Sequence, residues 1–387
     1  MERSRGISFS ENIRDPSTTR VRSARDDNFM KILLTGGGTL GSVSPLLAIY
    51  EEAKKQGKHW SWFWVGTRHG TERKVVESLD IKYEWVPSAK FRRYTSLQNL
   101  VDPFLLIASF LRCLFIIMNT KPDIIIGAGS FIGVPVIWAG WLFRKKIIIH
   151  QQDIRPTFSN KLTAFCSTKI TTSFEKSLED YKKEKSEWVG NPVRNALLNG
   201  NPEIIKKKFK LNDSYPTLLV TGGSSGAKAI NEWVWSNLRE LTGKINLIHL
   251  TGQGKQRELK RENYHQLEFL HGDMFHALAC ADVVLTRAGI STLTELAYLE
   301  KPAILVPMPL THQEDNAAYF ASQHAARMYR QDQLDDRVVR QVKELLSSED
   351  EREKLSKHIG EIMKKGGRER MVEIIESLSP RTSSTSS

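Results

Sequence analysis

The chain has 387 residues, of which 40% are hydrophobic and 26% are charged, and it carries a formal net charge of +12 at pH 7. This length predicts two domains with cores of their own, and the composition is typical of a folded soluble protein, which excludes a wholly disordered chain. The three cysteines are far apart and form no Cys-x-x-Cys pair, so we expect neither a zinc site nor a disulfide framework. We expect the protein to work in a reducing compartment.

The excess of basic residues is concentrated in one part of the chain. Residues 30–190 contain 23 Lys and Arg against 14 Asp and Glu, whereas residues 191–387 contain 27 against 25 and residues 1–29 contain 6 against 5. This asymmetry indicates an anionic partner for the first half: nucleic acid, an anionic lipid surface or a phosphorylated substrate. A basic protein without any such partner is the alternative.

The predicted elements begin after a polar segment. Residues 1–29 are rich in Arg, Ser and Asp and lack the apolar region of a signal peptide, so we expect a disordered extension, and Met30 is a possible start of the functional chain. Strand-like apolar runs lie at 31–37, 60–66, 122–129 and 145–153, and the short runs "KITTS" (169–173) and "SEWVGNPV" (186–193) extend the series. Helical patterns such as 44–57 fall between them. This alternation predicts a doubly wound parallel sheet, that is, an α/β domain over residues 30–190.

The same pattern restarts after the Asn-Pro turn in "VGNPVRNALL". Apolar runs at 217–221, 245–252, 267–272, 281–289 and 301–309 predict a second parallel sheet, so a second domain is expected over residues 191–362. A charged helical region follows, with its last helix at 363–378, and the serine-rich tail 379–387 is expected to be disordered.

One segment of the first domain suits a membrane surface. "LQNLVDPFLLIASFLRCLFIIMN" (97–119) is strongly apolar and includes Phe104, but its uninterrupted part is too short to span a bilayer. Directly before it stand Lys90, Phe91, Arg92 and Arg93, which mix basic and aromatic side chains. A buried core helix is the alternative, but basic and apolar groups side by side favour a peripheral membrane contact.

Two glycine-rich turns follow predicted strands, "GGGTLGS" (36–42) and "GGSSGA" (222–227). Glycines let backbone amides approach an anion at the start of a helix. Neither turn has the usual dinucleotide fingerprint or the Gly-Lys-Ser/Thr of a P-loop. Two such turns on two domains therefore predict two anionic ligands that meet in a cleft, although a tight turn without a ligand is the alternative for each.

Polar residues follow other predicted strands, where ligands bind in open α/β sheets. Gly289 opens a predicted helix that contains Glu295, a candidate for accepting two hydroxyl hydrogen bonds from a ribose, and Gln313 and Asn316 offer amides to a sugar. His150, Asp153 and Asn160 follow a strand of the first domain. Taken singly, a structural role is the simpler explanation of Glu295 or of His150.

Together these motifs resemble one family. "GGGTLGSVSPLLAI", "GAGSFIGVP", "HQQDIRPTFSNKL", "VGNPVR", "VTGGSSGAKAIN" and "RAGISTLTELAYLEKPAILVPMPLTHQEDNA" occur in the order and spacing of the MurG family of glycosyltransferases. The resemblance covers about residues 30–375. It implies a GT-B fold, in which two Rossmann-like doubly wound domains face a central cleft and the last helix crosses back to the first domain.

The resemblance also implies a reaction and its site. The family transfers N-acetylglucosamine from UDP-N-acetylglucosamine to the lipid-linked N-acetylmuramyl acceptor of peptidoglycan synthesis, at the cytoplasmic face of the cell membrane, which implies a role in cell wall biogenesis, cell shape and cell division. It implies an anionic membrane surface as partner, no metal or other cofactor, and no nucleic acid. The implied donor ligands are Arg194, Gly223, Ser224, Gly289, Thr292, Glu295, Gln313 and Asn316, and the implied acceptor ligands are Gly37, Gly38, Thr39, Gly41 and Asn160.

The chain departs from the family pattern at the implied general base. Ser42 stands where the family usually has a histidine, and a serine hydroxyl cannot act as a base near neutral pH without an activator. Asp153 stands where the family usually has asparagine. We therefore expect Asp153 to be the general base, with His150 as the second candidate. The departure leaves open a GT-B transferase with another lipid-linked acceptor, and the shared fold leaves open a nucleotide-sugar 2-epimerase; charge alone would also allow a non-catalytic binder.

Overall fold

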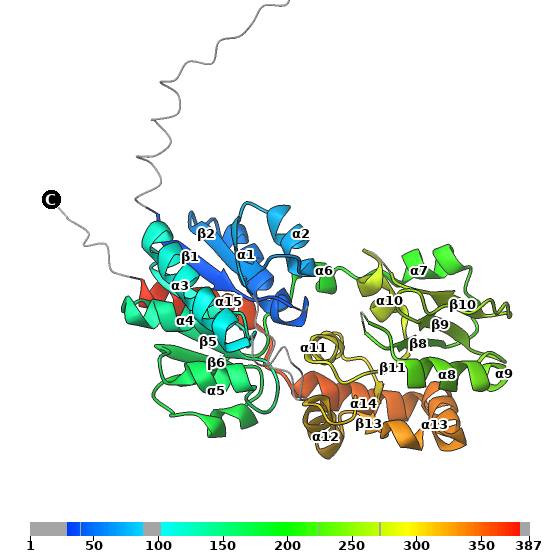
Figure 1. Ribbon diagram of the computed structural model, residues 1–387. Helices are drawn as coiled ribbons and strands as arrows, with labels where there is room; N and C mark the ends of the chain where they lie inside the picture. Colours follow the sequence, from blue (N-terminus) through cyan, green and yellow to red (C-terminus); the bar gives the residue numbers. More distant parts are fainter. Residues whose placement is uncertain (1–28, 39, 88–101, 224, 271, 380–387) are drawn as a thin grey trace, which may run out of the picture.

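The computed structural model describes residues 29–38, 40–87, 102–223, 225–270 and 272–379 (Figure 1). The two ends expected to be disordered, residues 1–29 and 379–387, therefore lie outside the described residues except for Phe29 and Ser379. Six expected site residues also lie outside them, namely Thr39, Ser224, Lys90, Phe91, Arg92 and Arg93.

The first domain is built on a seven-stranded parallel sheet in the order β3-β2-β1-β4-β5-β6-β7. The central strands β1 and β4 are apolar on both sides, as in doubly wound sheets whose two faces are covered by helices. The chain runs outward from β1 in both directions, so the boundary between β1 and β4 is the topological switch point where ligands are expected. The strands are β1 (Lys31–Thr35), β2 (Ser61–Thr67), β3 (Lys82–Val86), β4 (Ile124–Gly127), β5 (Lys146–Gln151), β6 (Lys169–Thr172) and β7 (Ser186–Trp188).

The two faces of this sheet bury different helices. Ile32 and Leu34 of β1 point to the face covered by α1, whereas Leu33 points to the face covered by α3 and α4, and all three side chains are fully buried. This alternation along β1 is the two-residue period of a strand. The helices of the domain are α1 (Ser44–Lys55), α2 (Thr71–Glu77), α3 (Asp102–Thr120), α4 (Gly133–Leu142) and α5 (Phe158–Ala164).

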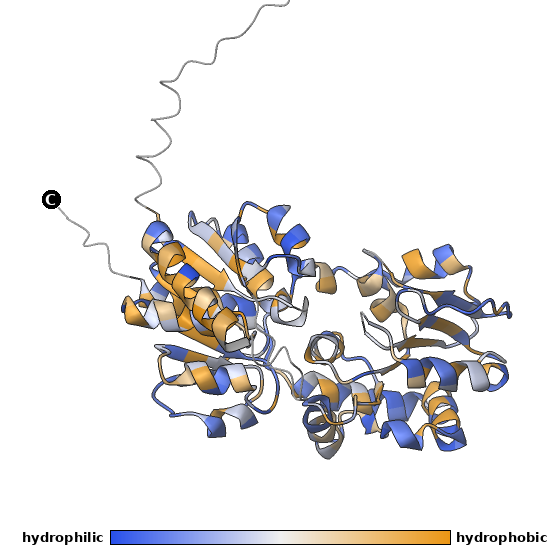
Figure 2. Cartoon of the chain, viewed as in Figure 1, coloured by the Kyte–Doolittle hydropathy of each residue, from blue (hydrophilic) through white to orange (hydrophobic). Residues whose placement is uncertain are grey.

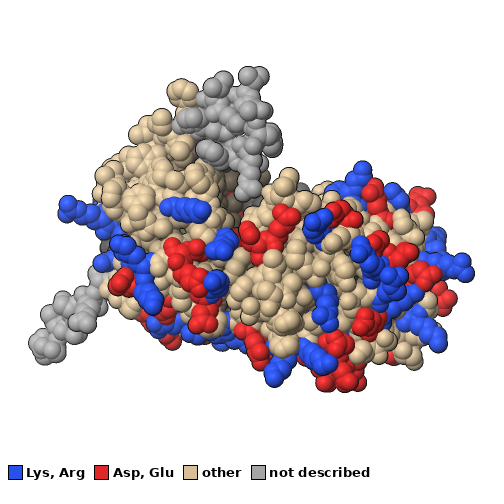
Figure 3. Space-filling view, turned by 90° about the horizontal axis from the view of Figure 1, so that it is seen from below, with Lys and Arg blue, Asp and Glu red and all other residues tan. Residues whose placement is uncertain are grey.

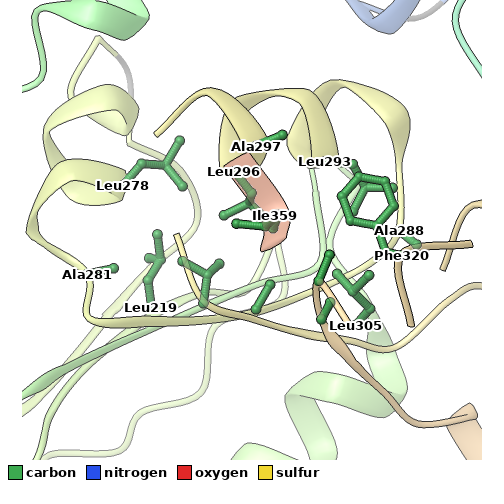
Figure 4. Packing of buried hydrophobic residues seen from close by; sticks show 14 of the residues in the cluster. Leu219, Leu278, Ala281, Ala288, Leu293, Leu296, Ala297, Leu305, Phe320 and Ile359 are labelled. Atoms are coloured by element: carbon green, nitrogen blue, oxygen red, sulfur yellow. The ribbon is translucent and has the colours of Figure 1, made fainter. Parts of the chain in front are cut away.

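The second domain has a six-stranded parallel sheet in the order β10-β9-β8-β11-β12-β13. Its central strand β8 sends Leu219 into a core with Leu278, Leu296 and Phe320 (Figure 4). The strands are β8 (Thr217–Thr221), β9 (Asn246–Leu250), β10 (Tyr264–Leu267), β11 (Val283–Thr286), β12 (Ala303–Leu305) and β13 (Arg327–Met328). The helices are α6 (Asn195–Leu198), α7 (Pro202–Phe209), α8 (Lys228–Ser236), α9 (Leu238–Leu241), α10 (Met274–Cys280), α11 (Ile290–Tyr298), α12 (Gln313–Ser322), α13 (Asp336–Ser347) and α14 (Glu349–Glu361).

The last helix, α15 (Gly367–Leu378), returns to the first domain and packs beside α1 (Figure 1). Met371, Val372 and Ile375 are buried in the same cluster as Ile32 and Leu34 of β1. Arg368, at the start of the helix, forms a buried ion pair of 3.1 Å with Glu52 of α1. The chain therefore crosses between the domains twice, once before α6 and once before α15.

Two doubly wound parallel sheets are what the sequence predicts, but three details differ. The two-residue edge strand β13 is absent from the prediction. The strand predicted at 267–272 lies instead at Tyr264–Leu267, where His265 and Gln266 occupy the edge of the sheet. The prediction also omits β3, whose residues are mostly half-buried. Edge strands bury one side or less, so their sequences lack the continuous apolar run that marks a central strand.

Candidate functional site

A pocket lies between the two domains and is lined by residues of both. Ser44, Pro45 and Gln152 come from the first domain, and Phe275, Ser291, Thr294 and Glu295 come from the second; Asn191, Pro192, Val193, Arg194 and Leu197 line it from the segment that joins them. This is the cleft that two facing doubly wound domains create. Two of the predicted site residues, Arg194 and Glu295, meet in it.

Glu295 lies in the second turn of α11, the helix that follows the central strand β11. Its side chain is partly buried, and burial raises the pKa of its carboxyl from 4.5 to about 7. Gly289 is the N-cap, and Ser291 and Thr292 are partly buried in the first turn. The positive end of a nine-residue helix and a carboxylate thus face the same pocket, which suits a ligand with both phosphates and hydroxyls.

Arg194 is bound to the first domain while it lines the pocket. Its Nε donates to Glu51 Oε1 at 2.7 Å, and the backbone amide of Asn195 donates to Glu51 Oε2 at 3.2 Å. Glu51 belongs to α1, so this pair connects the segment between the domains to the helix that opens after the first glycine-rich turn. The guanidinium therefore has a partner on one side and the pocket on the other.

Asp153 and Asn316, predicted as a base and a donor ligand, contact each other across the domains. Asn316 Nδ2 donates to Asp153 Oδ1 at 2.8 Å, and the amide of Ile154 donates to Asn316 Oδ1 at 3.1 Å. Both side chains are buried. Burial raises the pKa of Asp153, while the nearby His312, with Nε2 at 3.8 Å from Oδ1, acts in the opposite direction.

His150 is fully buried and belongs to a hydrogen-bonded chain that also crosses the domains. Its Nδ1 lies 3.0 Å from Thr171 Oγ1 and its Nε2 lies 3.0 Å from Asn191 Oδ1. Asn191 Nδ2 in turn donates to Thr294 Oγ1 at 2.7 Å, one residue before Glu295. Burial lowers the pKa of His150 to about 4, so the imidazole is neutral at pH 7 and links β5 to α11.

The first glycine-rich turn is held at the carboxyl end of β1. The carbonyl of Gly37 accepts hydrogen bonds from Ser130 Oγ at 3.0 Å and from Ser42 Oγ at 3.3 Å. Gly38 has a φ of +86°, which glycine adopts without strain, and it is exposed. Gly41 and Ser42 follow in a short 3-10 turn.

Asn160 lies near the same edge of the sheet, on α5. Its side chain is buried, and its Nδ2 has no hydrogen-bond partner among the described residues. Buried amide groups without a partner are uncommon and are often completed by a ligand.

The remaining predicted donor residues lie at the start of a helix and after a strand of the second domain: Gln313 begins α12, and Gly223 follows β8. Gln313 Oε1 accepts the amide of Met308 at 3.1 Å, which closes the turn after β12. Gly223 has a φ of +76° and follows β8. Neither residue lines the pocket described above.

Gln152, Asn191 and Thr294 are among the pocket residues that the sequence motifs did not predict. Gln152 follows β5 directly and Asn191 follows β7, so the rule that ligands bind after the carboxyl ends of strands could have found both. Gln152 is buried and its Oε1 has no partner among the described residues. Among these same residues no group of three or more His, Cys, Asp or Glu is arranged to hold a metal ion.

Comparison with protein families and curated sequences gives consistent matches. Residues 32–172 match the glycosyltransferase family 28 N-terminal domain, and residues 217–370 match the glycosyltransferase family 28 C-terminal domain. A Bacillus thuringiensis protein named UDP-N-acetylglucosamine–N-acetylmuramyl-(pentapeptide) pyrophosphoryl-undecaprenol N-acetylglucosamine transferase 3 is 36% identical over 322 residues, 81% of this chain and 91% of that protein. A Bacillus cereus transferase of the same description is 35% identical over 356 residues, 90% and 99% of the two chains.

Solved structures share the fold at lower identity. Acinetobacter baumannii MurG superposes with a TM-score of 0.69 at 22% identity, covering 90% of this chain and 99% of that one. A Neisseria meningitidis UDP-GlcNAc 2-epimerase, solved with UDP-GlcNAc bound, has a TM-score of 0.66 at 14% identity, covering 90% and 100%. With the two doubly wound sheets, these likenesses confirm the GT-B fold.

Proposed function

The chain belongs to the family of UDP-N-acetylglucosamine–N-acetylmuramyl-(pentapeptide) pyrophosphoryl-undecaprenol N-acetylglucosamine transferases, and on that premise we propose its reaction. It is a hexosyltransferase that moves N-acetylglucosamine from UDP-N-acetylglucosamine to the 4-hydroxyl of the N-acetylmuramyl-(pentapeptide) acceptor on undecaprenyl pyrophosphate, which makes it an enzyme of peptidoglycan synthesis. The observation that carries this proposal is the pocket where Glu295 and Arg194 meet beside the start of α11.

The second domain binds the donor in this proposal. The carboxylate of Glu295 accepts the ribose hydroxyls, and the first amides of α11 together with Arg194 face the diphosphate. Helix dipoles and a guanidinium stabilise the negative charge that develops on departing UDP without the need for a metal ion. Asn191 orients this helix through its hydrogen bond to Thr294. We assign Ser224, Gly223 and Gln313 to the same ligand by the resemblance of their motifs.

The first domain binds the acceptor and activates it. The turn with Gly37, Gly38 and Gly41 faces the acceptor pyrophosphate, with Asn160 beside it. The acceptor hydroxyl attacks the anomeric carbon in line, with inversion, and Asp153 takes its proton. Burial raises the pKa of that carboxyl above its ordinary value, which makes the carboxylate a stronger base than an exposed aspartate. His150, buried and neutral, positions Asn191 and has no proton-transfer role in this proposal.

An assay with UDP-N-acetylglucosamine and a soluble analogue of the lipid-linked acceptor tests the proposal. We expect transfer of radiolabelled N-acetylglucosamine that depends on the acceptor, with release of one UDP per product. A nucleotide-sugar 2-epimerase, which shares the fold, would instead invert carbon 2 of the donor without an acceptor. Transfer to a different polyprenyl-linked sugar, but not to the N-acetylmuramyl acceptor, would show that Ser42 marks another acceptor specificity.

We further propose that the enzyme works as a peripheral protein at the cytoplasmic face of the cell membrane, where its product would serve cell wall biogenesis, cell shape and cell division. Helix α3 supports this, because an apolar stripe along it is exposed, from Phe104, which is 72% exposed, through Ile107 and Leu111 to Phe115. Figure 2 shows the helix as strongly apolar, and on the face seen in Figure 3 part of the first domain is free of charged residues, whereas charges of both signs are scattered over the second. Within the described residues, every helix is too short or too polar to cross a bilayer.

Replacing Ile107, Leu111 and Phe115 together with serine should abolish most membrane binding. Burying each of these side chains contributes about 1.5–3 kcal/mol, so the triple variant should bind vesicles of phosphatidylglycerol and phosphatidylethanolamine at least about 100-fold more weakly. Co-sedimentation measures this. The matched control replaces Ile204 and Leu259, exposed apolar residues of the second domain, and should bind like wild type. Equal binding by the triple variant would exclude α3 as the membrane contact.

A further inference from the structure

Glu72, the second residue of α2, is a fully buried carboxylate beside the first glycine-rich turn. Its Oε1 accepts the amide of Thr67 at 2.8 Å and the hydroxyl of the same residue at 2.5 Å. Its Oε2 accepts the amide of Gly38 at 3.4 Å. These partners are all neutral. Burying a carboxyl group is costly unless it is well hydrogen-bonded, and here Glu72 is satisfied by backbone and hydroxyl donors of two neighbouring segments.

Glycines surround this carboxylate closely. A Cβ atom at Gly37 would lie 2.5 Å from Oε1, one at Gly70 would lie 2.0 Å from Oε2, and one at Gly66 would lie 3.2 Å from Oε1. Real Cβ atoms do not approach an oxygen at the first two of these distances. The absence of side chains at Gly37 and Gly70 is therefore what lets the turn and the start of α2 close around Glu72.

The turn is held from two sides as a result. Glu72 accepts the amide of Gly38 on one side, and on the other Ser130 Oγ donates to the carbonyl of Gly37. Tyr83, which donates to the carbonyl of Thr67 at 2.7 Å, supports the residue that binds Glu72. Burial raises the pKa of Tyr83, and the charge of Glu72 raises it further, so this phenol stays protonated and able to donate.

We propose that Glu72 is a positioning residue that fixes the turn at Gly37 and Gly38 in the conformation that receives the acceptor pyrophosphate. This rests on the proposed function, in which that turn faces the acceptor. A negative charge cannot itself bind a pyrophosphate, so the carboxylate acts from behind the turn, through the backbone of Gly38. It orders a segment that contains several glycines and would otherwise lose much conformational entropy on binding.

Glu72→Gln is the informative substitution because it preserves shape and removes one acceptor. The carboxylate uses both oxygens as acceptors, one toward Thr67 and the other toward Gly38. A glutamine amide has one oxygen, so its NH₂ group must face an N–H donor at one of the two positions. The variant therefore loses one of the two attachments without leaving a cavity.

We expect Glu72→Gln to raise KM for the acceptor analogue by about 10- to 100-fold, as for a misplaced binding group. The thermal stabilisation by UDP, which binds the second domain in our proposal, should stay as in wild type. Glu77→Gln is the matched control, since Glu77 lies on the same helix but is exposed and pairs with Arg73; its acceptor KM should not change.

Thr67→Val provides a second test if Glu72→Gln fails to fold. It removes only the hydroxyl that donates to Oε1, and we expect a smaller rise of acceptor KM in the same direction. An unchanged acceptor KM in the folded variant, with an active wild type, would overturn the role of Glu72. Equal weakening of acceptor and UDP binding would overturn it as well, because that indicates general destabilisation. A wild type that transfers no sugar would instead contradict the proposed function.

Discussion

Glu295→Gln is expected to lower kcat/KM for UDP-N-acetylglucosamine by about 100-fold or more, because charge-assisted hydrogen bonds to two ribose hydroxyls are each worth about 1.5–3 kcal/mol. Glutamine has nearly the same shape but only one acceptor oxygen and no charge. The loss should appear both in steady-state kinetics and in thermal stabilisation by UDP. Glu300→Gln is the control and should behave like wild type. Glu300 is exposed, lies just after the same helix and pairs with Lys365.

The raised pKa of Glu295 adds a pH dependence to this prediction. The carboxylate must be ionised to accept two hydroxyls, so UDP affinity of the wild type should increase as the pH rises through about 7. In Glu295→Gln this dependence should disappear. A variant whose UDP affinity and pH dependence both match wild type would contradict the assignment of Glu295 to the ribose.

The same carboxyl should affect stability in the opposite direction. Its pKa is 4.5 when the chain is unfolded and about 7 in the folded protein, so the folded state binds more protons between these values. Its contribution is therefore fully favourable below about pH 4.5 and is lost as the pH rises to about 7. At pH 8 and without ligand, the melting temperature of Glu295→Gln should be a few degrees above that of wild type. Binding-site residues often lower the stability of the unliganded protein in this way.

Asp153→Asn is expected to lower kcat by about 100- to 10,000-fold, the range that a general base contributes. The substitution keeps the acceptor oxygen for Asn316 Nδ2, so the contact across the domains should persist and UDP stabilisation should not change. What is lost is the basic oxygen. The kcat of wild type should rise with pH as Asp153 ionises, and the rise should be absent in the variant; the neighbouring His312 lowers the pKa of Asp153.

Adding Ser42→His to Asp153→Asn provides the decisive comparison. The family resemblance places a histidine at position 42, so the double variant should recover part of the lost turnover if the base can act from either side of the acceptor. His312→Gln serves as a control for the neighbour, and it should shift the pH profile without abolishing turnover. Near-normal kcat in Asp153→Asn would exclude Asp153 as the base.

The cleft is connected by polar contacts that no single domain contains. His150, Asn191 and Thr294 form one chain, Asp153 and Asn316 form another, and Arg194 with Glu51 forms a third. Each includes a residue that the motifs marked as functional. The residues proposed to bind donor and acceptor therefore also hold the two domains together, so ligand binding in the pocket and the relative position of the domains are coupled.

Much of the fold could be predicted because central strands are buried on both faces. Runs such as "KILLT" and "TLLVT" are apolar throughout, and the glycines that follow mark the turns to α1 and α8. The edge strand β3 was not predicted, and β10 was predicted a few residues too late in the chain. Half-exposed strands carry polar residues, so their sequences resemble those of loops. The motifs also marked Glu295 and Arg194, which line the pocket between the domains, whereas the roles of these residues and of Asp153 stay predictions.

The sequence by itself determined the two doubly wound domains, the family and the segments that carry the site, since these depend on local pattern and on residues close together in the chain. Only the tertiary structure decided which of those residues meet. Asn316 bonds to Asp153, 163 positions earlier, and Asn191 bonds to Thr294, 103 positions later. It also showed that His150 is buried and neutral, and that Glu72 lies behind the glycine-rich turn. The burial of these polar side chains and their pairing arise from packing between distant segments, and no local pattern in the chain encodes them.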